Sequence, residues 1–335
     1  MFPVSALLLA IAATTQAYTP SCGALRAPKA GDTVYISIDD GPGSLGRPFL
    51  LDALDQLNSR TDADGTRVTP VAVSFFDCGY NFCGDNFRQG NCSTYAFENA
   101  QQLLARTIKA GHMVGAHTDT HFTDPTTYQC DYIKMIPPTQ IQVEPKFAAC
   151  GTDAASDFVR GALRIDQALR DPYLWGSSKA EVARQHQAIQ NLWSFVRTPC
   201  TNAWRLPGVN KTIGLPSWLP AESAARLATI DQVSAGSLAC RPPAFQGKPW
   251  HAIGWDAEWW LNPANSPEQE KCTVVANVLN TFENPAKAGP GNQSVVLLTH
   301  DWLFTDYDKA AIFQNVVAEL QARGYALSSV DKYKY

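Results

Sequence analysis

Short apolar runs rich in β-branched residues alternate along this chain with segments whose apolar residues recur every three or four positions. The run at 33–39 predicts a buried strand, and Pro48 predicts the first turn of a helix that continues to about Ser59. Further strands are predicted at 71–76, 112–117, 204–206, 252–256, 294–300 and 325–329, and further helices at 94–109, 181–196, 267–282 and 308–323. This strand–helix repetition predicts an α/β fold with a parallel sheet or barrel.

One long segment interrupts the alternation. Residues 122–178 are polar, contain two cysteines and are punctuated by prolines. We expect a long insertion loop there, within a domain that covers 18–335, because no internal repeat and no Pro/Ser-rich linker divides the chain.

The N-terminus has the pattern of a secretory signal peptide at 1–17. An apolar stretch from Val4 to Ala13 leads to Thr15-Gln16-Ala17, a small-residue cleavage site. The stretch is too short to span a membrane. We therefore expect a secreted protein, extracellular or periplasmic, without a membrane anchor.

Nine cysteines follow, which in an exported chain indicate disulfides. Sequence does not fix their pairing, although Cys83–Cys92 and Cys130–Cys150 are plausible local bridges. The odd count leaves one thiol unpaired or paired outside the chain. Irregular spacing without C-x-x-C argues against a zinc–cysteine site.

Charge excludes some partners. The chain has 335 residues, ample for a core, and a net charge of −4, so no basic surface favours nucleic acid or an anionic membrane. No G-x-S-x-G string is present, which disfavours a serine esterase.

The polar residues with chemical potential follow the predicted strands. Asp39 and Asp40 end the first strand, and His117 and His121 follow the third. Arg205, Asp256 and His300 stand at the ends of later strands. Since the carboxyl ends of parallel strands gather at one face, we expect a site there.

Two histidines four residues apart can face one ion. With a carboxylate from Asp40, His117 and His121 form a His₂Asp set with open coordination positions, the pattern of catalytic zinc. Exposed or core histidines are the simpler reading of this spacing alone. A cation also explains why Asp39 and Asp40 stand side by side.

A glycine turn offers a competing interpretation. Gly41, Gly43 and Gly46 spell G-x-G-x-x-G after a strand, as in dinucleotide-binding loops. However, Asp39 and Asp40 stand where a pyrophosphate would lie, and an exported protein does not meet cellular NAD. A tight turn is the simplest explanation.

The strings SIDDGPG, HTDTH, RLPG, DAEW and LTH resemble the five ordered motifs of the NodB-homology polysaccharide deacetylases, carbohydrate esterase family 4. The longer strings GWDAEW and VVLLTHDWLF look most similar to the secreted bacterial chitin-oligosaccharide deacetylases of that family. The resemblance extends from Thr33 to about Tyr325. It implies a distorted (β/α) barrel that hydrolyses the acetamide of N-acetylglucosamine units and releases acetate.

The resemblance also implies a role for each motif residue. Asp40, His117 and His121 would bind zinc or another divalent cation such as cobalt. Asp39 would be the general base and His300 the general acid, with Arg205 orienting Asp39 and Asp256 tuning His300. Substrate would meet Gly208 and either Trp259 or Trp260, with Trp250, Trp255 and Trp302 as further stacking candidates.

Two motifs depart from the family pattern. The third usually reads R-P-P-Y, so Arg205-Leu206-Pro207-Gly208 lacks the tyrosine ring but keeps a backbone N–H for the oxyanion. The fourth, usually D-x-x-D-W, permits two registers in Asp256-Ala257-Glu258-Trp259-Trp260, which leaves open the tryptophan that lines the acetyl pocket.

The sequence leaves several substrates open. Chitin oligosaccharides are the substrate that we expect. Peptidoglycan and acetylxylan are alternatives, because their deacetylation needs the same chemistry. An inactive carbohydrate-binding relative is the alternative from another class, although all five residues expected to bind the metal or move protons are present. We expect a monomer whose partner is an N-acetylglucosamine-containing oligosaccharide or polysaccharide.

Overall fold

The computed structural model describes residues 18–43, 45–61, 66–82, 94–121, 143–215 and 217–335, with 94–98 described by their backbone alone. The predicted signal peptide at 1–17 and the suggested Cys83–Cys92 bridge lie outside these ranges.

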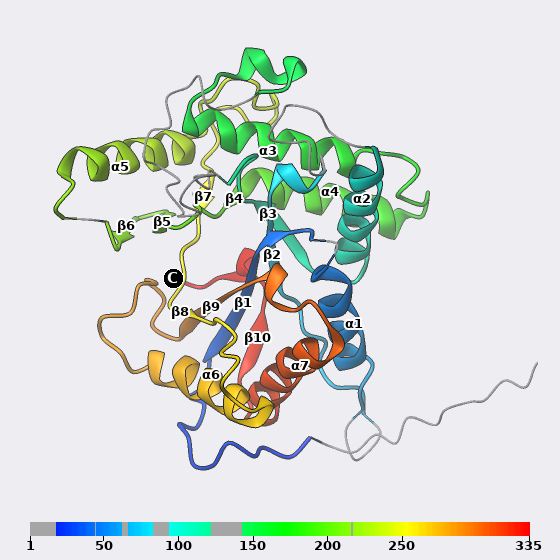
Figure 1. Cartoon of the computed structure of the whole chain (residues 1–335), viewed down its shortest axis with the longest axis vertical. Coiled ribbons are helices and arrows are strands. Elements are labelled where there is room, and N and C mark those ends of the chain that lie inside the picture. Colours follow the sequence, from blue (N-terminus) through cyan, green and yellow to red (C-terminus); the bar gives the residue numbers. More distant parts are fainter. Residues whose placement is uncertain (1–17, 44, 62–65, 83–93, 122–142, 216) are drawn as a thin grey trace, which may run out of the picture.

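A single curled sheet of ten strands runs through the molecule (Figure 1). Its order is β6-β5-β7-β4-β3-β2-β1-β9-β8, with β10 pairing to β1. All pairs are parallel except those of β5, which runs antiparallel to β6 and β7. The strands are β1 (Thr33–Gly41), β2 (Ser74–Asp77), β3 (Met113–Ala116), β4 (Phe195–Val196), β5 (Asn202–Leu206), β6 (Val209–Ile213), β7 (His251–Ala252), β8 (Ala257–Glu258), β9 (Ser294–His300) and β10 (Ala326–Ser328).

Helices surround this sheet in an order that follows the strands. Neighbouring contacts link α6, α7, α1, α2, α4, α3 and α5 in turn, so they form an outer layer around the curled sheet (Figure 1). The helices are α1 (Arg47–Asn58), α2 (Thr94–Lys109), α3 (Ala154–Leu169), α4 (Lys179–Ser194), α5 (Pro220–Ala235), α6 (Pro267–Thr281) and α7 (Tyr307–Ala322). Between edge strands β6 and β8 the sheet stays open, which gives the distorted (β/α) barrel predicted from the sequence.

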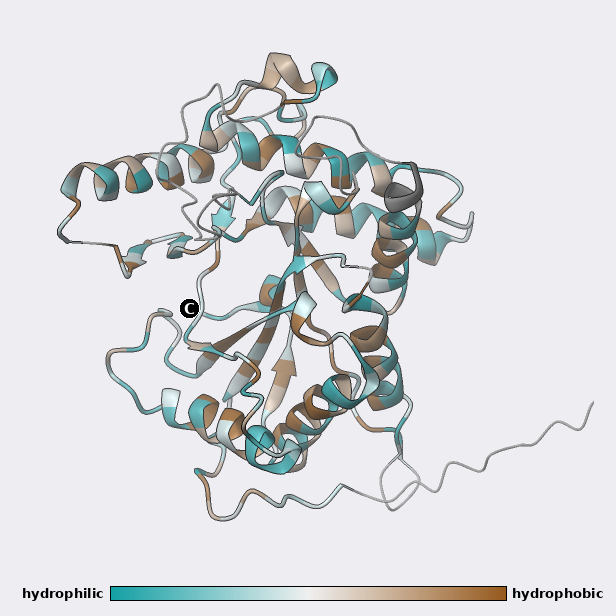
Figure 2. Ribbon diagram, in the orientation of Figure 1, coloured by the Kyte–Doolittle hydropathy of each residue, from teal (hydrophilic) through white to brown (hydrophobic). Residues whose placement is uncertain are grey.

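The core lies on both faces of β1. Val34, Ile36 and Ile38 point toward the helices, whereas Tyr35 faces a smaller cluster with Trp204. Burial on both faces explains why this strand reads as a continuous apolar run. Figure 2 shows the hydrophobic residues concentrated in the central strands and on parts of the helices.

The prediction of a long insertion loop at 122–178 is wrong for its second part. Within 143–178 the chain forms a short 3₁₀ helix, η4 (Pro145–Cys150), and then α3. Phe158, Val159, Ala162 and Ile165 of α3 are all fully buried. Their i, i+1, i+4, i+7 spacing is that of a core helix, and the polar residues and prolines around it obscured the pattern.

Other elements also differ from expectation. Helix α5 has no counterpart in the predicted set, although it begins with Pro220 and ends at Gly236, whose φ of +71° is left-handed. The expected strand at 252–256 is instead two short strands, β7 and β8.

Two disulfides lie within the described residues, Cys22–Cys272 and Cys150–Cys240. The suggested Cys130–Cys150 bridge is therefore wrong. Cys200 is also disulfide-bonded, and among the described cysteines only Cys78 is free, buried in the core. No helix in the described ranges has the length and apolar character needed to cross a bilayer.

Candidate active site

The two adjacent aspartates lie at a bulge in β1. Asp40 has a φ of +72°, and the pairing of β1 with β2 shifts register between Asp39 and Gly41. Successive strand residues normally point to opposite faces, but a bulge re-aims them. Both carboxylates therefore reach the same imidazole: His117 Nε2 lies 3.7 Å from Asp39 Oδ2 and 3.4 Å from Asp40 Oδ1.

The two histidines face the same aspartate. His121 Nε2 is 3.1 Å from Asp40 Oδ1. Nδ1 of His117 lies 2.8 Å from the backbone carbonyl of Arg197. Because a carbonyl only accepts, Nδ1 is the donor in this hydrogen bond, and Nε2 is the ring nitrogen that faces Asp40.

These three residues fit a divalent cation. Asp40 Oδ1 is buried and has no hydrogen-bond partner among the described residues, although two imidazole nitrogens lie close to it. An oxygen and two nitrogens that converge without hydrogen-bond direction form an N₂O donor set, as catalytic zinc sites use. Cys78 extends the cluster, since its sulfur lies within 4.8 Å of ligand atoms of Asp40 and His117.

The electrostatics of Asp40 and His121 also suit a cation site. Burial opposes ionisation of Asp40, yet His121 and His117 hold the pKa of this carboxyl well below its usual range. Burial likewise opposes the charge on His121, but Asp40 raises the pKa of that imidazole. Asp40 is thus ionised within this cluster, as a carboxylate ligand of a cation must be.

Helix α3 supports the loop that bears the histidines. The Asp119 N–H donates to the Asp157 carbonyl at 3.0 Å, and Arg164 Nε donates to Asp119 Oδ1 at 2.6 Å. Burial raises the pKa of Asp119 to about 6, against the opposing effect of Arg164. A Cβ on Gly161 would lie 2.2 Å from the Thr118 carbonyl oxygen, so only glycine permits this approach. The segment expected to be a loop thus helps to shape the site.

The arginine beside Asp39 is Arg197, and the assignment of Arg205 is wrong. Arg197 Nη1 lies 3.4 and 3.3 Å from the two oxygens of Asp39, while Nη2 donates to Ser37 Oγ at 3.1 Å. Arg205 instead donates from Nε to Asp231 at 2.6 Å and from Nη1 to Thr212. Arg205 belongs to β5, near the open edge of the sheet, whereas Arg197 directly follows the internal strand β4.

A sequence signal for Arg197 existed. Arg197-Thr198-Pro199 is another Arg-x-Pro string, and it directly follows an apolar run. Gly208 follows Arg205-Leu206-Pro207, and it is an exposed turn residue between β5 and β6 with a φ of +75°. No described hydrogen bond links Gly208 to Asp39 or Asp40.

Asp256 does not tune His300 by contact. Its Oδ1 accepts from the Gly289 N–H and its Oδ2 from the Val296 N–H at 2.9 Å, so it anchors the loop that leads into β9. His300 Nδ1 is buried without a hydrogen-bond partner among the described residues. Burial lowers the pKa of His300, and the charges of Asp40 and Asp39 oppose this shift.

Of the two fourth-motif tryptophans, Trp260 lies at the site. Its ring stacks on His300 with centroids 4.5 Å apart, and it is half exposed. Trp259 is buried, donates from Nε1 to Glu270 at 2.8 Å and stacks on Phe313, so it is a core residue. His300 itself is the cross-strand neighbour of Asp39.

A buried ionic network that the sequence did not suggest lies beneath these groups. Arg47 donates to Asp77 at 2.6 Å and to Asp301 at 3.2 Å, and all three side chains are fully buried. Asp301 Oδ2 also accepts from the Gly43 N–H at 2.8 Å. The network joins the ends of β1, β2 and β9, and of these strands β1 bears Asp39 and Asp40 while β9 bears His300.

This network explains the glycine-rich turn. A Cβ on Gly41 would lie 1.8 Å from the Arg47 guanidinium, and one on Gly46 would lie 1.8 Å from the Asp301 carbonyl oxygen. The glycines allow close packing against protein groups. The dinucleotide interpretation is therefore not needed.

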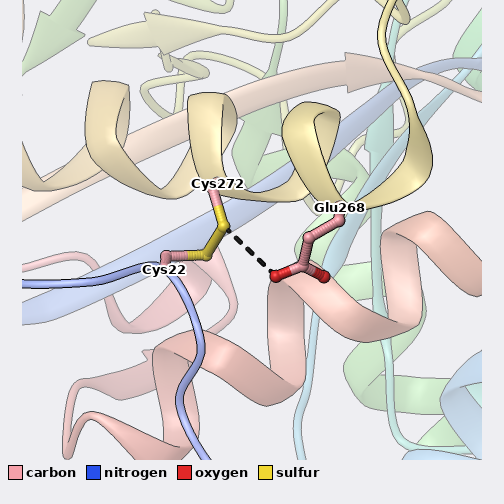
Figure 3. Close-up of side chains that lie close together, drawn as sticks. All are labelled: Cys22, Glu268 and Cys272. Carbon is pink, nitrogen blue, oxygen red and sulfur yellow. Dashed lines mark hydrogen bonds between the residues drawn. A yellow bond between two sulfur atoms is a disulfide. The ribbon is translucent and has the colours of Figure 1, made fainter.

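A second group of potential ligands, Cys22, Glu268 and Cys272, is visible in Figure 3. Its two sulfurs form a disulfide and so offer no thiolate, and the Glu268 side chain is largely exposed. We do not regard it as a metal site.

Comparisons with known proteins give alignments to solved structures alone. No family model matches the chain. No curated protein matches it either. Among solved structures, the catalytic domain of a peptidoglycan N-acetylglucosamine deacetylase from Eubacterium rectale aligns over 92% of this chain and 93% of that chain, at 16% identity and a TM-score of 0.43.

Two further structures align similarly. A family 4 acetyl xylan esterase from Clostridium thermocellum, in complex with a cobalt ion, covers 90% of this chain and 89% of its own at 14% identity and a TM-score of 0.44. A family 4 carbohydrate esterase from Bacillus anthracis covers 92% and 84% at 13% identity and a TM-score of 0.39. At these scores the functional conclusion rests on the residues of this chain.

Proposed function

We propose that this chain is an exported, metal-dependent deacetylase of carbohydrate esterase family 4 that removes acetyl groups from N-acetylglucosamine units of chitin oligosaccharides. The observation that supports it best is the convergence of Asp39, Asp40, His117 and His121 at the carboxyl ends of β1 and β3. Two carboxylates and two imidazoles at this distance are the donor set for hydrolysis assisted by a cation.

Asp40, His117 and His121 are the residues that would hold the cation, which we propose is zinc. A bound divalent cation supplies a water of lowered pKa and polarises the carbonyl of the substrate. His117 is oriented for this role by its hydrogen bond to the Arg197 carbonyl, since such partners fix the tautomer of a ligating imidazole.

Asp39 and His300 move the protons. Asp39 accepts one at its carboxylate, which Arg197 holds toward the cluster at 3.3 and 3.4 Å. His300, the cross-strand neighbour of Asp39, donates a proton to the departing amine. Trp260 covers the His300 ring and leaves part of its own face free to contact a sugar.

Export is supported by the signal-like sequence at 1–17 and by two disulfides in the described residues. Disulfides persist in oxidising compartments and are rare in the cytosol.

The test is acetate release from N-acetylchitooligosaccharides by the purified protein, with EDTA and then with zinc restored. We expect release to stop with chelator and to return with zinc. Asp39→Asn should lower the rate roughly 10²- to 10⁴-fold, because it removes the general base without changing the side-chain shape. Asp308→Asn, on the exposed first turn of α7, is the matched control.

Other outcomes separate the alternatives. Release only from peptidoglycan or acetylxylan would change the substrate and keep the chemistry. Sugar binding without release, and without an effect of Asp39→Asn, would identify an inactive carbohydrate-binding relative.

A further inference from the structure

Trp302 contacts the site from an unexpected position. It lies in the 3₁₀ helix η5 (Asp301–Leu303), two residues after His300, and its side chain is 48% exposed. Despite this exposure, its indole Nε1–H donates to Asp40 Oδ2 at 2.9 Å. A hydrogen bond to an ionised carboxylate is stronger than one between neutral groups.

The two oxygens of Asp40 therefore have different surroundings. Oδ1 faces the Nε2 atoms of His117 and His121, whereas Oδ2 accepts from Trp302. The backbone carbonyl of Asp40 is also held, since Asn81 Nδ2 donates to it at 2.8 Å. Trp302 is thus the contact that fixes rotation of the carboxylate about its own side-chain bonds.

The indole is itself fixed in place. Its ring lies 5.6 Å from that of Trp260 and 5.7 Å from that of His300, measured between centroids. The preceding residue, Asp301, is fully buried and accepts hydrogen bonds from Arg47 and from the Gly43 N–H. The donor is therefore held before any cation binds.

From this geometry we propose that Trp302 is a positioning residue for the metal ligand Asp40: it occupies Oδ2 and leaves Oδ1 as the one oxygen that meets the cation. The inference rests on the proposed function, in which Asp40, His117 and His121 bind a metal. Groups that hydrogen-bond to metal ligands typically change metal affinity by about 10- to 100-fold.

The experiment measures zinc affinity of the full-length protein by competition with a chromophoric chelator. Trp302→Phe keeps an aromatic ring beside Trp260 and His300 but removes the N–H donor. We expect its dissociation constant for zinc to rise by about 10- to 100-fold. Trp218→Phe makes the same substitution at a largely exposed tryptophan away from the site, and this variant should bind zinc like the wild type.

A second readout reports on coordination directly. With cobalt in place of zinc, release of Oδ2 would let Asp40 approach the ion with both oxygens, so we expect the visible absorption spectrum to change in Trp302→Phe but not in Trp218→Phe. Circular dichroism in the presence of chelator checks that both variants fold.

The possible results test the role of Trp302 and the metal site separately. Wild-type affinity and spectrum in Trp302→Phe would overturn the inference. Normal affinity in Trp302→Phe with weak binding in Trp302→Ala would also overturn it, because ring packing would then be the cause. A wild-type protein that binds no zinc or cobalt would overturn the proposed metal site itself, a failure distinguishable from that of Trp302 alone.

Discussion

Asp39 and Asp40 are adjacent in sequence but are compensated by different partners. Asp39 faces the guanidinium of Arg197, which is fully buried, while Asp40 faces two imidazoles. Two neighbouring carboxylates repel each other, and burial strengthens that repulsion. Each carboxylate therefore has a partner of its own, which suits a base and a metal ligand that stand side by side.

At the residue scale, this assignment predicts unequal effects for the two candidate arginines. Arg197→Lys keeps the positive charge but loses the fork that spans Asp39 and Ser37, so we expect the base to shift and kcat to fall by roughly 100-fold. Arg205→Lys alters a pair with Asp231, whose side chain is half exposed, and should leave kcat near the wild-type value. Acetate release from a chitin oligosaccharide measures both, and the reverse order of effects would restore Arg205 as the partner of Asp39.

The sequence identified the charged residues of the site, but it did not identify which of them contact one another. Asp39, Asp40, His117, His121 and His300 stand out because they end strands, and the structure brings the first four together. Several Arg-x-Pro strings occur in the chain, and only the structure shows that Arg197 is the one beside Asp39. The Arg47 network was invisible because its partners, Asp77 and Asp301, come from distant parts of the chain.

At the scale of elements, α3 connects the segment 143–178 to the proposed metal centre. Gly161 lies against the Thr118 carbonyl, and Asp157 of α3 accepts hydrogen bonds from the backbone of Asp119 and Thr120. The helix therefore fixes the loop between His117 and His121.

We predict that Gly161→Ala destabilises the protein and weakens zinc binding. In an ordinary helix interior this change stabilises by about 1 kcal/mol. Here the new Cβ meets backbone at 2.2 Å, so α3 or the histidine loop must move, at a cost of about 1–3 kcal/mol in the free energy of unfolding. Urea denaturation and chelator competition measure the two effects.

Gly176→Ala is the control for this prediction. The three atoms nearest to its added Cβ all belong to the Glu181 carboxylate, the end of a flexible side chain that can move aside. A stabilised Gly161→Ala protein with normal zinc affinity would show that α3 does not constrain the loop.

Elements with strong local patterns were predicted well. The strand β1 and the helices α1, α6 and α7 follow from apolar periodicity and from Pro or Gly at their ends. Strands of two residues, such as β4, β7 and β8, are defined by their neighbours in the sheet, and no local pattern marks them. The helix α3 escaped because buried Arg160 and Arg164 made its inner face look polar.

At the scale of the whole molecule, the N-terminal segment is attached to the C-terminal helices. The N–H groups of Ser21 and Cys22 donate to Glu319 of α7, and Lys271 of α6 donates to Ser21. The Cys22–Cys272 disulfide closes the same contact across 250 residues. This segment leads into the start of β1, the opposite end of the strand from Asp39 and Asp40.

We therefore predict that replacing both cysteines by serine separates stability from catalysis. Cross-linking so distant a pair restricts the unfolded chain, and its loss should lower the free energy of unfolding by about 2–4 kcal/mol, as read from urea denaturation. The site at the far end of β1 keeps the Arg47 network and the support of α3, so acetate release per folded molecule should match that of the wild type at 25 °C. A double variant of unchanged stability would mean that the contacts with Glu319 hold the segment by themselves. Loss of activity in the fully folded variant would mean that the N-terminal segment acts on the site through β1, and that the two ends of this strand are coupled.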